Sequence, residues 1–280
     1  MRAYQNAASF VPKLATKVMQ WLDPQKDDVI LDVGCGDGVL NVEMARVVAQ
    51  GSGRIHGIDS SPAMIAAAQK AAESAALADS RVAYITQLLT FLLPTPVLDA
   101  TALVSTPSLQ QGKFTKAFSN AALHWILRPE RTREDVFRGV REAVAPGGAF
   151  VFEMGGLGNV CEVRAALLSA VGRRVGLARA QEADPWFFPD EDWVRQVMEE
   201  RVGGWKVERA EREWRPTRAD KGGVEGWVRL MAKNWFEILP EAEREECIRE
   251  VVEVLEIAQR QPSGGHSFNY VRLRVFARRV

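Results

Sequence analysis

Short apolar runs alternate with amphipathic stretches along the first half of the chain. Five runs have the length and composition of buried strands, at residues 28–33, 54–58, 81–86, 114–119 and 149–154. Between them, helical spacing of apolar residues predicts helices over 39–49, 62–77 and 130–144, and Ser60 or Ser61 is the candidate cap of the second. The third helix is expected to end at Pro146-Gly147-Gly148. This alternation predicts right-handed βαβ units and a parallel sheet with helices on both faces, an α/β fold.

The pattern changes near residue 155. The second half holds six of the eight tryptophans and long charged helical stretches such as residues 241–259. Two strand-like pieces, 205–213 and 268–277, are too few to form their own sheet, so we expect them at the edge of the first sheet. The prediction is one domain over 1–280, with a core (1–154), a helical substrate cap that includes one edge strand (155–267) and a last strand (268–280).

Composition and charge narrow the range of partners. The 280 residues are 47% apolar and 26% charged, which is typical of a folded globular protein. Thirty-six basic residues balance thirty-six acidic ones, and without a basic excess we expect no nucleic-acid partner. No apolar stretch has the length of a membrane span or of a signal-peptide core, so we expect a soluble cytoplasmic protein with no membrane partner. The sequence gives no indication of the oligomeric state.

The three cysteines are isolated in the sequence. Cys35, Cys161 and Cys247 form no C-x-x-C pair and have no histidine at metal-ligand spacing. The pattern predicts free thiols, with neither a disulfide framework nor a metal site.

A glycine-rich loop follows the first predicted strand and precedes a helix, in the segment LDVGCGDG from Leu31 to Gly38. Glycines there allow a tight turn and a close approach to a ligand. The triphosphate motif GxxxxGK[ST] is absent, and the dinucleotide motif GxGxxG would need a glycine where Val39 stands. The carboxylates of Asp32 and Asp37 would repel a pyrophosphate but attract a cation. S-adenosylmethionine carries both an ammonium and a sulfonium group, so it fits this loop.

A further acidic residue, Asp59, ends the second predicted strand 21 residues after Gly38. A carboxylate at this place can accept hydrogen bonds from both ribose hydroxyls of a nucleoside. The alternative is that the glycines only form a turn and Asp59 only caps a helix.

Four segments resemble the class I S-adenosylmethionine-dependent methyltransferases: LDVGCGDG, GIDSSPAMIAAA, VLDATAL and SNAALHW. The resemblance is to the small-molecule group that includes trans-aconitate and juvenile hormone acid methyltransferases, and it covers residues 4–152 and 270–277. It implies a Rossmann-like, seven-stranded, mostly parallel sheet whose last strand is antiparallel, with helices on both faces and a helical cap. It also implies S-adenosyl-L-methionine as cofactor and a small-molecule substrate.

The resemblance assigns roles to individual residues. It implies that Gly34 and Gly36 lie under the methionine part of the cofactor, that Asp59 binds the ribose, and that Ser60 and Met64 lie beside the adenine. Cys35, between the two glycines, is a further candidate for cofactor binding. Asp99 and Ala100 resemble the pair that reads the adenine amino edge, although residues 87–98 separate them from the third predicted strand where the family has no such interval. Ser119 or Asn120 would offer a backbone carbonyl to the methionine ammonium, and Tyr4 and Phe10 resemble an aromatic segment that closes over the cofactor.

His124 and Trp125 are the candidate catalytic residues. They follow the fourth predicted strand and are expected at the carboxyl edge of the sheet, beside the transferable methyl group; core packing is the alternative for both. The sequence Ser-Asn-Ala-Ala at residues 119–122 lacks the Pro-Pro-Tyr of DNA amino-methyltransferases. Methylation of a small molecule at oxygen, including a carboxylate, is the leading hypothesis. N-methylation of an amine, a non-catalytic cofactor-binding protein and an NAD-dependent oxidoreductase are the alternatives.

Overall fold

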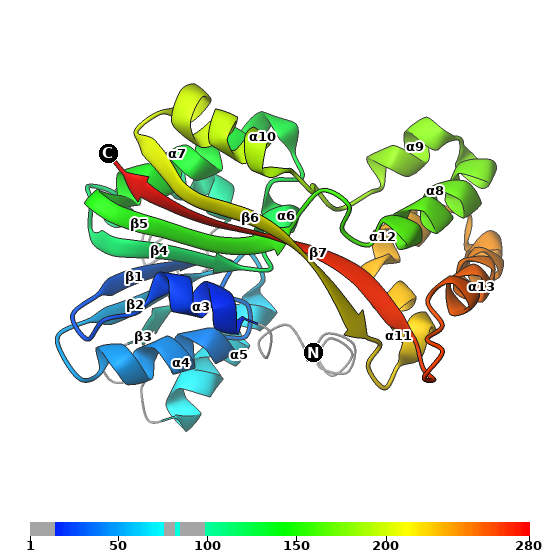
Figure 1. The fold of residues 1–280 in the computed structure, drawn as a ribbon, viewed down its shortest axis with the longest axis horizontal. Helices are drawn as coiled ribbons and strands as arrows, with labels where there is room; N and C mark the ends of the chain where they lie inside the picture. The colour runs from blue at the N-terminus through cyan, green and yellow to red at the C-terminus, as the bar shows by residue number, and fades with distance from the viewer. Residues whose placement is uncertain (1–14, 76–81, 85–98) are drawn as a thin grey trace, which may run out of the picture. The chain divides into compact units, whose positions relative to one another are not determined.

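A computed structural model describes residues 15–75, 82–84 and 99–280 (Figure 1). Its centre is a seven-stranded sheet with the order β3-β2-β1-β4-β5-β7-β6. The strands are β1 (Val29–Val33), β2 (Arg54–Ile58), β3 (Val82–Tyr84), β4 (Phe114–Asn120), β5 (Val144–Gly155), β6 (Trp205–Arg218) and β7 (Ser267–Arg279). Strands β1 to β5 pair in parallel, with β1 between β2 and β4. This confirms the predicted fold class, including the addition of the last two strands to the edge of the first sheet.

The central strands are apolar because both faces of the sheet are covered. In β1, Ile30, Leu31 and Val33 are fully buried. In the first half, α3 (Thr16–Leu22) precedes β1, and the helices between strands are α4 (Val39–Val48), α5 (Pro62–Ser74), α6 (Leu123–Ile126) and α7 (Arg133–Ala143). Short 3-10 helices lie before β4, namely η1 (Ala100–Ser105) and η2 (Pro107–Leu109), and before α7, namely η3 (Glu130–Thr132).

The described chain divides into two compact units. We call the first the core unit: it comprises the described part of 14–154, together with Pro189–Arg212 and Leu273–Val280. The second, the helical unit, comprises Gly155–Phe188 and Glu213–Arg272. Strands β6 and β7 each contribute residues to both units.

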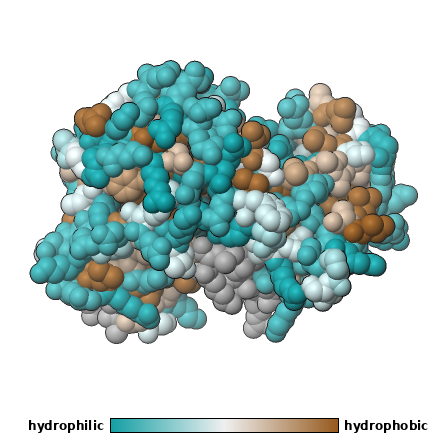
Figure 2. Space-filling view, viewed as in Figure 1, coloured by the Kyte–Doolittle hydropathy of each residue, from teal (hydrophilic) through white to brown (hydrophobic). Residues whose placement is uncertain are grey.

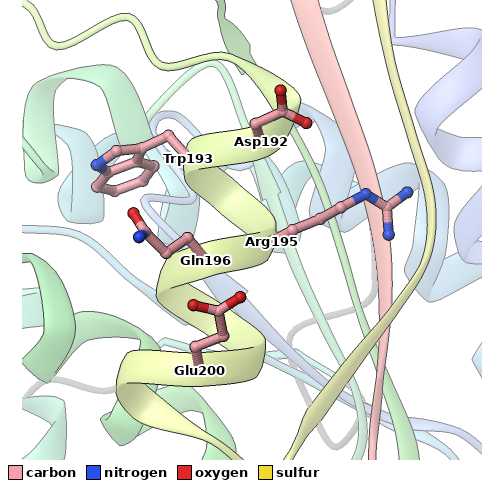
Figure 3. Close-up of a pocket in the computed structure, with 5 residues that line it drawn as sticks. All are labelled: Asp192, Trp193, Arg195, Gln196 and Glu200. Carbon is pink, nitrogen blue, oxygen red and sulfur yellow. The ribbon is translucent and has the colours of Figure 1, made fainter.

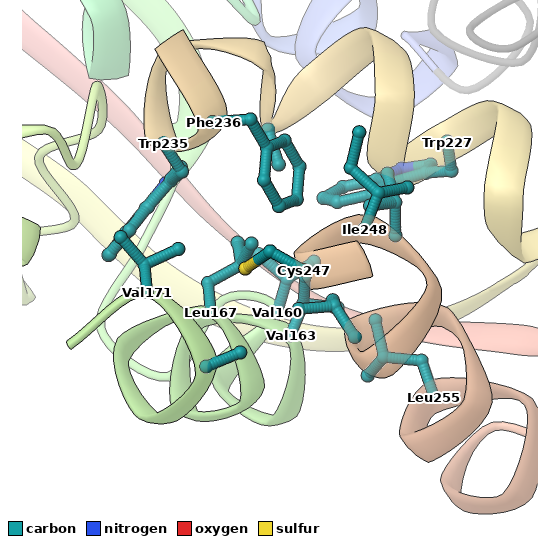
Figure 4. Close-up of a cluster of buried hydrophobic side chains, with 14 of the residues drawn as sticks. Val160, Val163, Leu167, Val171, Trp227, Trp235, Phe236, Cys247, Ile248 and Leu255 are labelled. Carbon is teal, nitrogen blue, oxygen red and sulfur yellow. The ribbon is translucent and has the colours of Figure 1, made fainter. Parts of the chain in front are cut away.

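The helical unit has a hydrophobic core of its own. Its helices are α8 (Cys161–Val175), α9 (Leu177–Glu182), α11 (Gly223–Met231), α12 (Lys233–Glu237) and α13 (Glu241–Ala258). Figure 4 shows Val163 and Leu167 of α8 facing Cys247 and Leu255 of α13, beside the aromatic rings of α11 and α12. Trp227 adds a buried hydrogen bond, because its Nε1–H donates to the hydroxyl of Tyr270 at 2.7 Å. Trp227 and its aromatic neighbours in this unit therefore serve packing.

The core unit also contains α10 (Glu191–Arg195) and the π-helical element η4 (Gln196–Val202). A separate apolar cluster, which includes Val18, Ile30, Met44 and Phe118, packs α3 and α4 against the sheet. Each unit is thus built around its own buried side chains.

Some predicted boundaries were wrong. Residues Pro146 to Gly148 lie inside β5 and do not end the preceding helix, because Val144 already pairs with Phe114 and the ladder resumes at Ala149 opposite Lys116. The extra residues form an irregularity of the bulge type, where Pro and Gly are tolerated in a strand. Strands β6 and β7 are also longer than the predicted 205–213 and 268–277. Of the two candidate caps, Ser61 is the one that caps α5.

The face of the molecule in Figure 2 is mostly hydrophilic, with separate hydrophobic spots. Within the described ranges, every helix is too short or too polar to cross a lipid bilayer.

Candidate functional site

The glycine-rich loop between β1 and α4 is held in a left-handed backbone conformation. The φ angles of Gly34, Gly36 and Gly38 are 76°, 57° and 76°, which glycine adopts at far lower cost than other residues. The backbone N–H groups of Gly34 and Cys35 both donate to the carbonyl of Ile58, at 2.8 and 3.0 Å. The loop is therefore fastened to the end of β2, where Asp59 stands.

Asp32 is the buried acid of this loop. Its side chain is 2% exposed and accepts a 2.7 Å hydrogen bond from Nδ2 of Asn41 on α4. Burial raises the pKa of Asp32 to about 7, because the hydrogen bond from Asn41 only partly offsets desolvation and Asp59 adds repulsion. Asn41 is itself fully buried, and its Oδ1 accepts no hydrogen bond from any residue that the structure describes.

Asp59 organises both the loop and the start of α5. Its Oδ2 accepts the N–H of Gly36 at 3.0 Å, and its Oδ1 accepts the N–H of Ser61 at 2.8 Å. Each carboxylate oxygen has a second lone pair, so Asp59 can still accept two hydrogen bonds from a ligand. Beyond it, Ser60 is exposed and Met64 is half-buried in the first turn of α5.

Cys35 and Asp37 complete the loop, and both are half-buried. Burial raises the pKa of the Cys35 thiol, and the nearby carboxylates of Asp32 and Asp59 raise it further. Cys35 is therefore a neutral thiol and not a nucleophile.

Asp99 is exposed and caps a short helix. Its Oδ1 accepts the N–H of Thr101 at 2.9 Å, at the start of η1, and the adjoining Ala100 is buried. The predicted interval at 87–98 lies outside the described residues, so the role of Asp99 at the adenine stays a prediction. Tyr4 and Phe10 lie outside the described residues as well.

The chain bends sharply where β4 ends. The hydroxyl of Ser119, which is fully buried, donates to the carbonyl of Val33 at 2.7 Å. Asn120 pairs in register with Glu153 of β5, and its Oδ1 has no hydrogen-bond partner within the described part of the chain. Ala121 then adopts a φ of 56°, and its N–H donates to the carbonyl of Glu153 at 2.8 Å. We call residues 120–122 the bend.

The bend touches the glycine loop directly. A Cβ atom at Gly34 would lie 2.3 Å from Cβ of Ala122, which no pair of side chains tolerates. The next residues form α6, where His124 is 8% exposed and Trp125 is 39% exposed, with their ring centroids 5.6 Å apart. The tertiary structure therefore brings the loop and the predicted catalytic segment together in the core unit.

Three residues of this site were missed by the sequence analysis: Asn41, Ala122 and Glu153. Asn41 could have been noticed as a polar residue among apolar ones in VLNVEMARVV. Ala122 carries no signal of its own, because its importance comes from a residue 88 positions earlier. Glu153 looks like an ordinary polar residue of a strand.

The donor and acceptor groups of this edge fit the cofactor. Asp32 and Asp59 place carboxyl groups at the carboxyl ends of β1 and β2. Asn41 Oδ1 on α4 and Asn120 Oδ1 at the end of β4 are buried acceptors that no described residue satisfies. S-adenosylmethionine supplies the complementary groups, namely a ribose diol, an ammonium and a sulfonium.

A separate surface depression of about 500 Å³ lies along α10 and η4 (Figure 3). It is lined by Asp192, Trp193, Arg195, Gln196 and Glu200, none of which is a predicted site residue. As for metals, the described residues contain no group of three or more His, Cys, Asp or Glu side chains that could hold an ion.

Comparisons with known proteins identify the family of the chain. A family model for the methyltransferase domain matches residues 30–148. An uncharacterized methyltransferase of Schizosaccharomyces pombe is 35% identical over 278 residues, which is 98% of this chain and 95% of that protein.

Solved structures share the fold at low identity. A putative methyltransferase from Bacillus halodurans has a TM-score of 0.60 at 14% identity, covering 95% of this chain and 98% of its own. Geranyl diphosphate C-methyltransferase from Streptomyces coelicolor, solved with S-adenosyl-L-homocysteine, has a TM-score of 0.51 at 15% identity, covering 95% of this chain and 79% of its own. The full-length relative, the matched domain and the fold agree: the chain belongs to the class I S-adenosylmethionine-dependent methyltransferases.

Proposed function

We propose that this methyltransferase transfers the methyl group to an oxygen of a small molecule, and that His124 contacts the acceptor. The cofactor supplies a methyl group that its sulfonium already activates. The likeness of SNAALHW to the trans-aconitate and juvenile hormone acid methyltransferases supports an oxygen acceptor, including a carboxylate. The balanced charge of the chain supports a small-molecule substrate over a nucleic acid.

The observation that carries the proposal is the contact between the bend and the glycine loop. Because Ala122 packs on Gly34, the helix that begins at Leu123 starts beside the loop that Asp32 and Asp59 flank. His124, the second residue of that helix, is the titratable side chain nearest along the chain to Ala122. Methyl transfer is an in-line displacement, so the enzyme gains most from holding the acceptor oxygen in line.

His124 can act in two ways. Toward a carboxylate, which is ionised at pH 7, it would donate a hydrogen bond and orient the oxygen. Toward a hydroxyl, it would accept the proton as a general base and must then be neutral. In the second case kcat/KM falls as the pH drops through the pKa of the histidine, and in the first it does not.

Three of the four arginines on α8 and α9 are already paired within the helical unit. Arg164 makes two hydrogen bonds to Asp184 Oδ2, at 2.9 and 2.6 Å. Arg173 and Arg174 both pair with Glu250. Each of these three guanidinium groups is thus already bound to an acidic side chain of its own unit.

The test uses His124→Ala with His266→Ala as its control. His266 lies in a loop of the helical unit and takes part in backbone hydrogen bonds that alanine preserves. We expect His124→Ala to lower kcat/KM by roughly 10- to 1000-fold while the affinity for S-adenosylhomocysteine stays within about twofold, because the side chain meets the acceptor and not the nucleoside. The control should change neither.

The reaction is followed by release of S-adenosylhomocysteine over a panel of hydroxy acids, carboxylic acids, phenols and amines, with mass spectrometry of the product. Methylation confined to amines would replace the oxygen acceptor by nitrogen. Full activity of His124→Ala on the true acceptor would return His124 to a packing role. Tight binding of S-adenosylhomocysteine without turnover of any compound would favour a protein that only holds the cofactor.

A further inference from the structure

A buried ion pair lies at the carboxyl end of β5, next to the bend. Arg274 of β7 donates from Nε to Oε2 of Glu153 at 2.6 Å, and each of the two side chains is 2% exposed. Transfer of both charges out of water costs about as much as their attraction returns, so such a pair is a weak source of stability by itself. Its place beside the candidate site suggests another role.

Glu153 holds the bend in place through its backbone. Its carbonyl accepts the N–H of Ala121 at 2.8 Å, and it stands in register with Asn120 across the β4–β5 ladder. Ala121 has a left-handed backbone, at a φ of 56°, which alanine adopts only when its surroundings hold it there. Any shift of the end of β5 would therefore release the bend and reorient α6.

Arg274 is itself fixed from a second side. Its Nη1 donates to Oε1 of Glu211 on β6 at 3.0 Å, and the same oxygen lies 2.5 Å from Nζ of Lys17 on α3. Arg209 lies 3.6 Å from the other oxygen of Glu211 and stacks at 3.9 Å over the ring of Trp21. Burial alone would raise the pKa of Glu211, but the hydrogen bonds from Lys17 and Arg274 outweigh it and lower that pKa. The guanidinium of Arg274 is thus held between two carboxylates, one buried and one near the surface.

We propose that Arg274 is a positioning residue for methyl transfer: it fixes Glu153, and through Glu153 the bend that orients His124. The planar fork of arginine can bond both carboxylates at once, whereas a lysine ammonium has no such fixed geometry. The proposal rests on the role of His124 in the proposed function.

The test compares Arg274→Met with Arg278→Met. Arg278 lies four residues along β7, and its guanidinium pairs with Glu208 of β6 in the same way, but both of these side chains are over 40% exposed. We expect Arg274→Met to lower kcat by roughly 10- to 100-fold with the acceptor KM within about twofold, because reacting groups that are misplaced by about 1 Å lose rate more than binding. Arg278→Met should match the wild type, and Arg274→Lys should recover part of the loss.

A second readout is independent of activity. The chain has three histidines, so NMR of ¹³Cε1-labelled histidine gives three signals, and His124→Ala assigns the one that matters. The His124 signal should shift, and its titration midpoint move, in Arg274→Met but not in Arg278→Met, while S-adenosylhomocysteine still binds both. This result holds even if His124→Ala proves active, so failure of the proposed function and failure of the positioning role are distinguishable.

Arg274→Met leaves Glu153 buried without its arginine and can unfold for that reason alone. The double variant Glu153→Gln/Arg274→Met removes both charges, so it leaves no unpaired buried charge and separates the positioning role from the cost of burying one. If the double variant folds, with a urea midpoint like that of the wild type, but loses kcat and shifts the His124 signal, the proposal stands. It is overturned if the single and double variants keep the His124 signal and kcat of Arg278→Met, or if both unfold, which would make the pair purely structural.

Discussion

At the scale of single residues, Asp32 shows how a ligand site is assembled at a cost to the fold. The carboxyl group is enclosed, receives one hydrogen bond from Asn41 and lies near a second acid, Asp59. A charge in this place is poorly compensated in the protein alone. Its environment suits a cationic ligand, whose binding supplies the missing countercharge.

Asp32→Asn should stabilise the ligand-free protein at neutral pH and not at strongly acidic pH. The pKa of Asp32 rises from 3.8 to about 7 on folding, so the cost of ionising it in the folded state is absent below pH 3.8, grows between these values and is complete above about pH 7. The gain in free energy of unfolding should therefore climb to at most about 4 kcal/mol at pH 8. Urea denaturation from pH 4.5 to pH 8 measures it.

Glu73→Gln, on the exposed side of α5, is the matched control and should show no such trend. The same Asp32→Asn variant should bind S-adenosylhomocysteine more weakly in calorimetry, since the ammonium loses a negative partner. A stability gain that is equal at pH 4.5 and pH 8 would contradict the account.

At the scale of elements, the loop and the bend are two tight turns that touch. Gly34 directly follows β1 and Ala122 directly precedes α6, and there is no room for a methyl group between them. Their contact makes the geometry of the cofactor loop depend on that of the segment that carries His124. A small residue is needed on both sides.

Gly34→Ala should therefore lower the free energy of unfolding by more than the strain of a left-handed backbone alone. Gly147 is the control, because its φ of 77° matches the 76° of Gly34 but its surroundings are open. We expect about 1–2 kcal/mol of destabilisation for Gly147→Ala, from backbone strain. Gly34→Ala adds about 1–3 kcal/mol from the clash with Ala122 and weakens S-adenosylhomocysteine binding.

The double variant Gly34→Ala/Ala122→Gly should regain the stability lost to the clash, because the methyl group of residue 122 is gone. It should not regain the stability lost to backbone strain at residue 34. Chemical denaturation and calorimetry of the four proteins separate the two terms. Equal losses of unfolding free energy in Gly34→Ala and Gly147→Ala would show that the contact with Ala122 adds nothing to the cost of the substitution.

At the scale of the whole molecule, each of the two units has its own hydrophobic core, and the candidate site belongs to one of them. All the described residues that we assign to the cofactor and to catalysis belong to the core unit. The helical unit packs four of its own tryptophans and phenylalanines, Trp186, Phe188, Trp227 and Phe268, as a chain of neighbouring rings. Because these rings are buried in their own unit, they support its stability.

Hydrogen exchange with and without S-adenosylhomocysteine should locate the cofactor in the core unit. At a ligand concentration of about 100 times Kd, amides that exchange by opening of the site slow by up to about 100-fold. We expect this slowing within residues 34–38, 59–64 and 119–124, and little change in α13. Protection confined to the helical unit would refute the assignment.

Much of the fold could be predicted from the sequence, because the signals are local. Apolar runs and helical periodicity located the strands and helices of the first half, and the glycines of LDVGCGDG mark the loop by the backbone angles that they alone adopt cheaply. Asp32 and Asp59 could be predicted as site residues for the same reason, since Asp32 is the second-last residue of β1 and Asp59 directly follows β2. The error at Pro146–Gly148 arose because pairing with β4 overrode the local turn signal.

What only the tertiary structure decided are contacts between residues far apart in the chain. Ala122 meets Gly34 across 88 positions and Arg274 meets Glu153 across 121. Such pairs leave no periodicity, because each partner is an ordinary residue of its own segment. Their meaning comes from the parallel sheet, which carries the ends of β1, β4 and β5 to one edge and sets β7 beside β5. The sequence by itself therefore determined the family, the cofactor and the glycine-rich loop proposed to bind it, while the packing of the sheet decided which residues support that loop and the segment that carries His124.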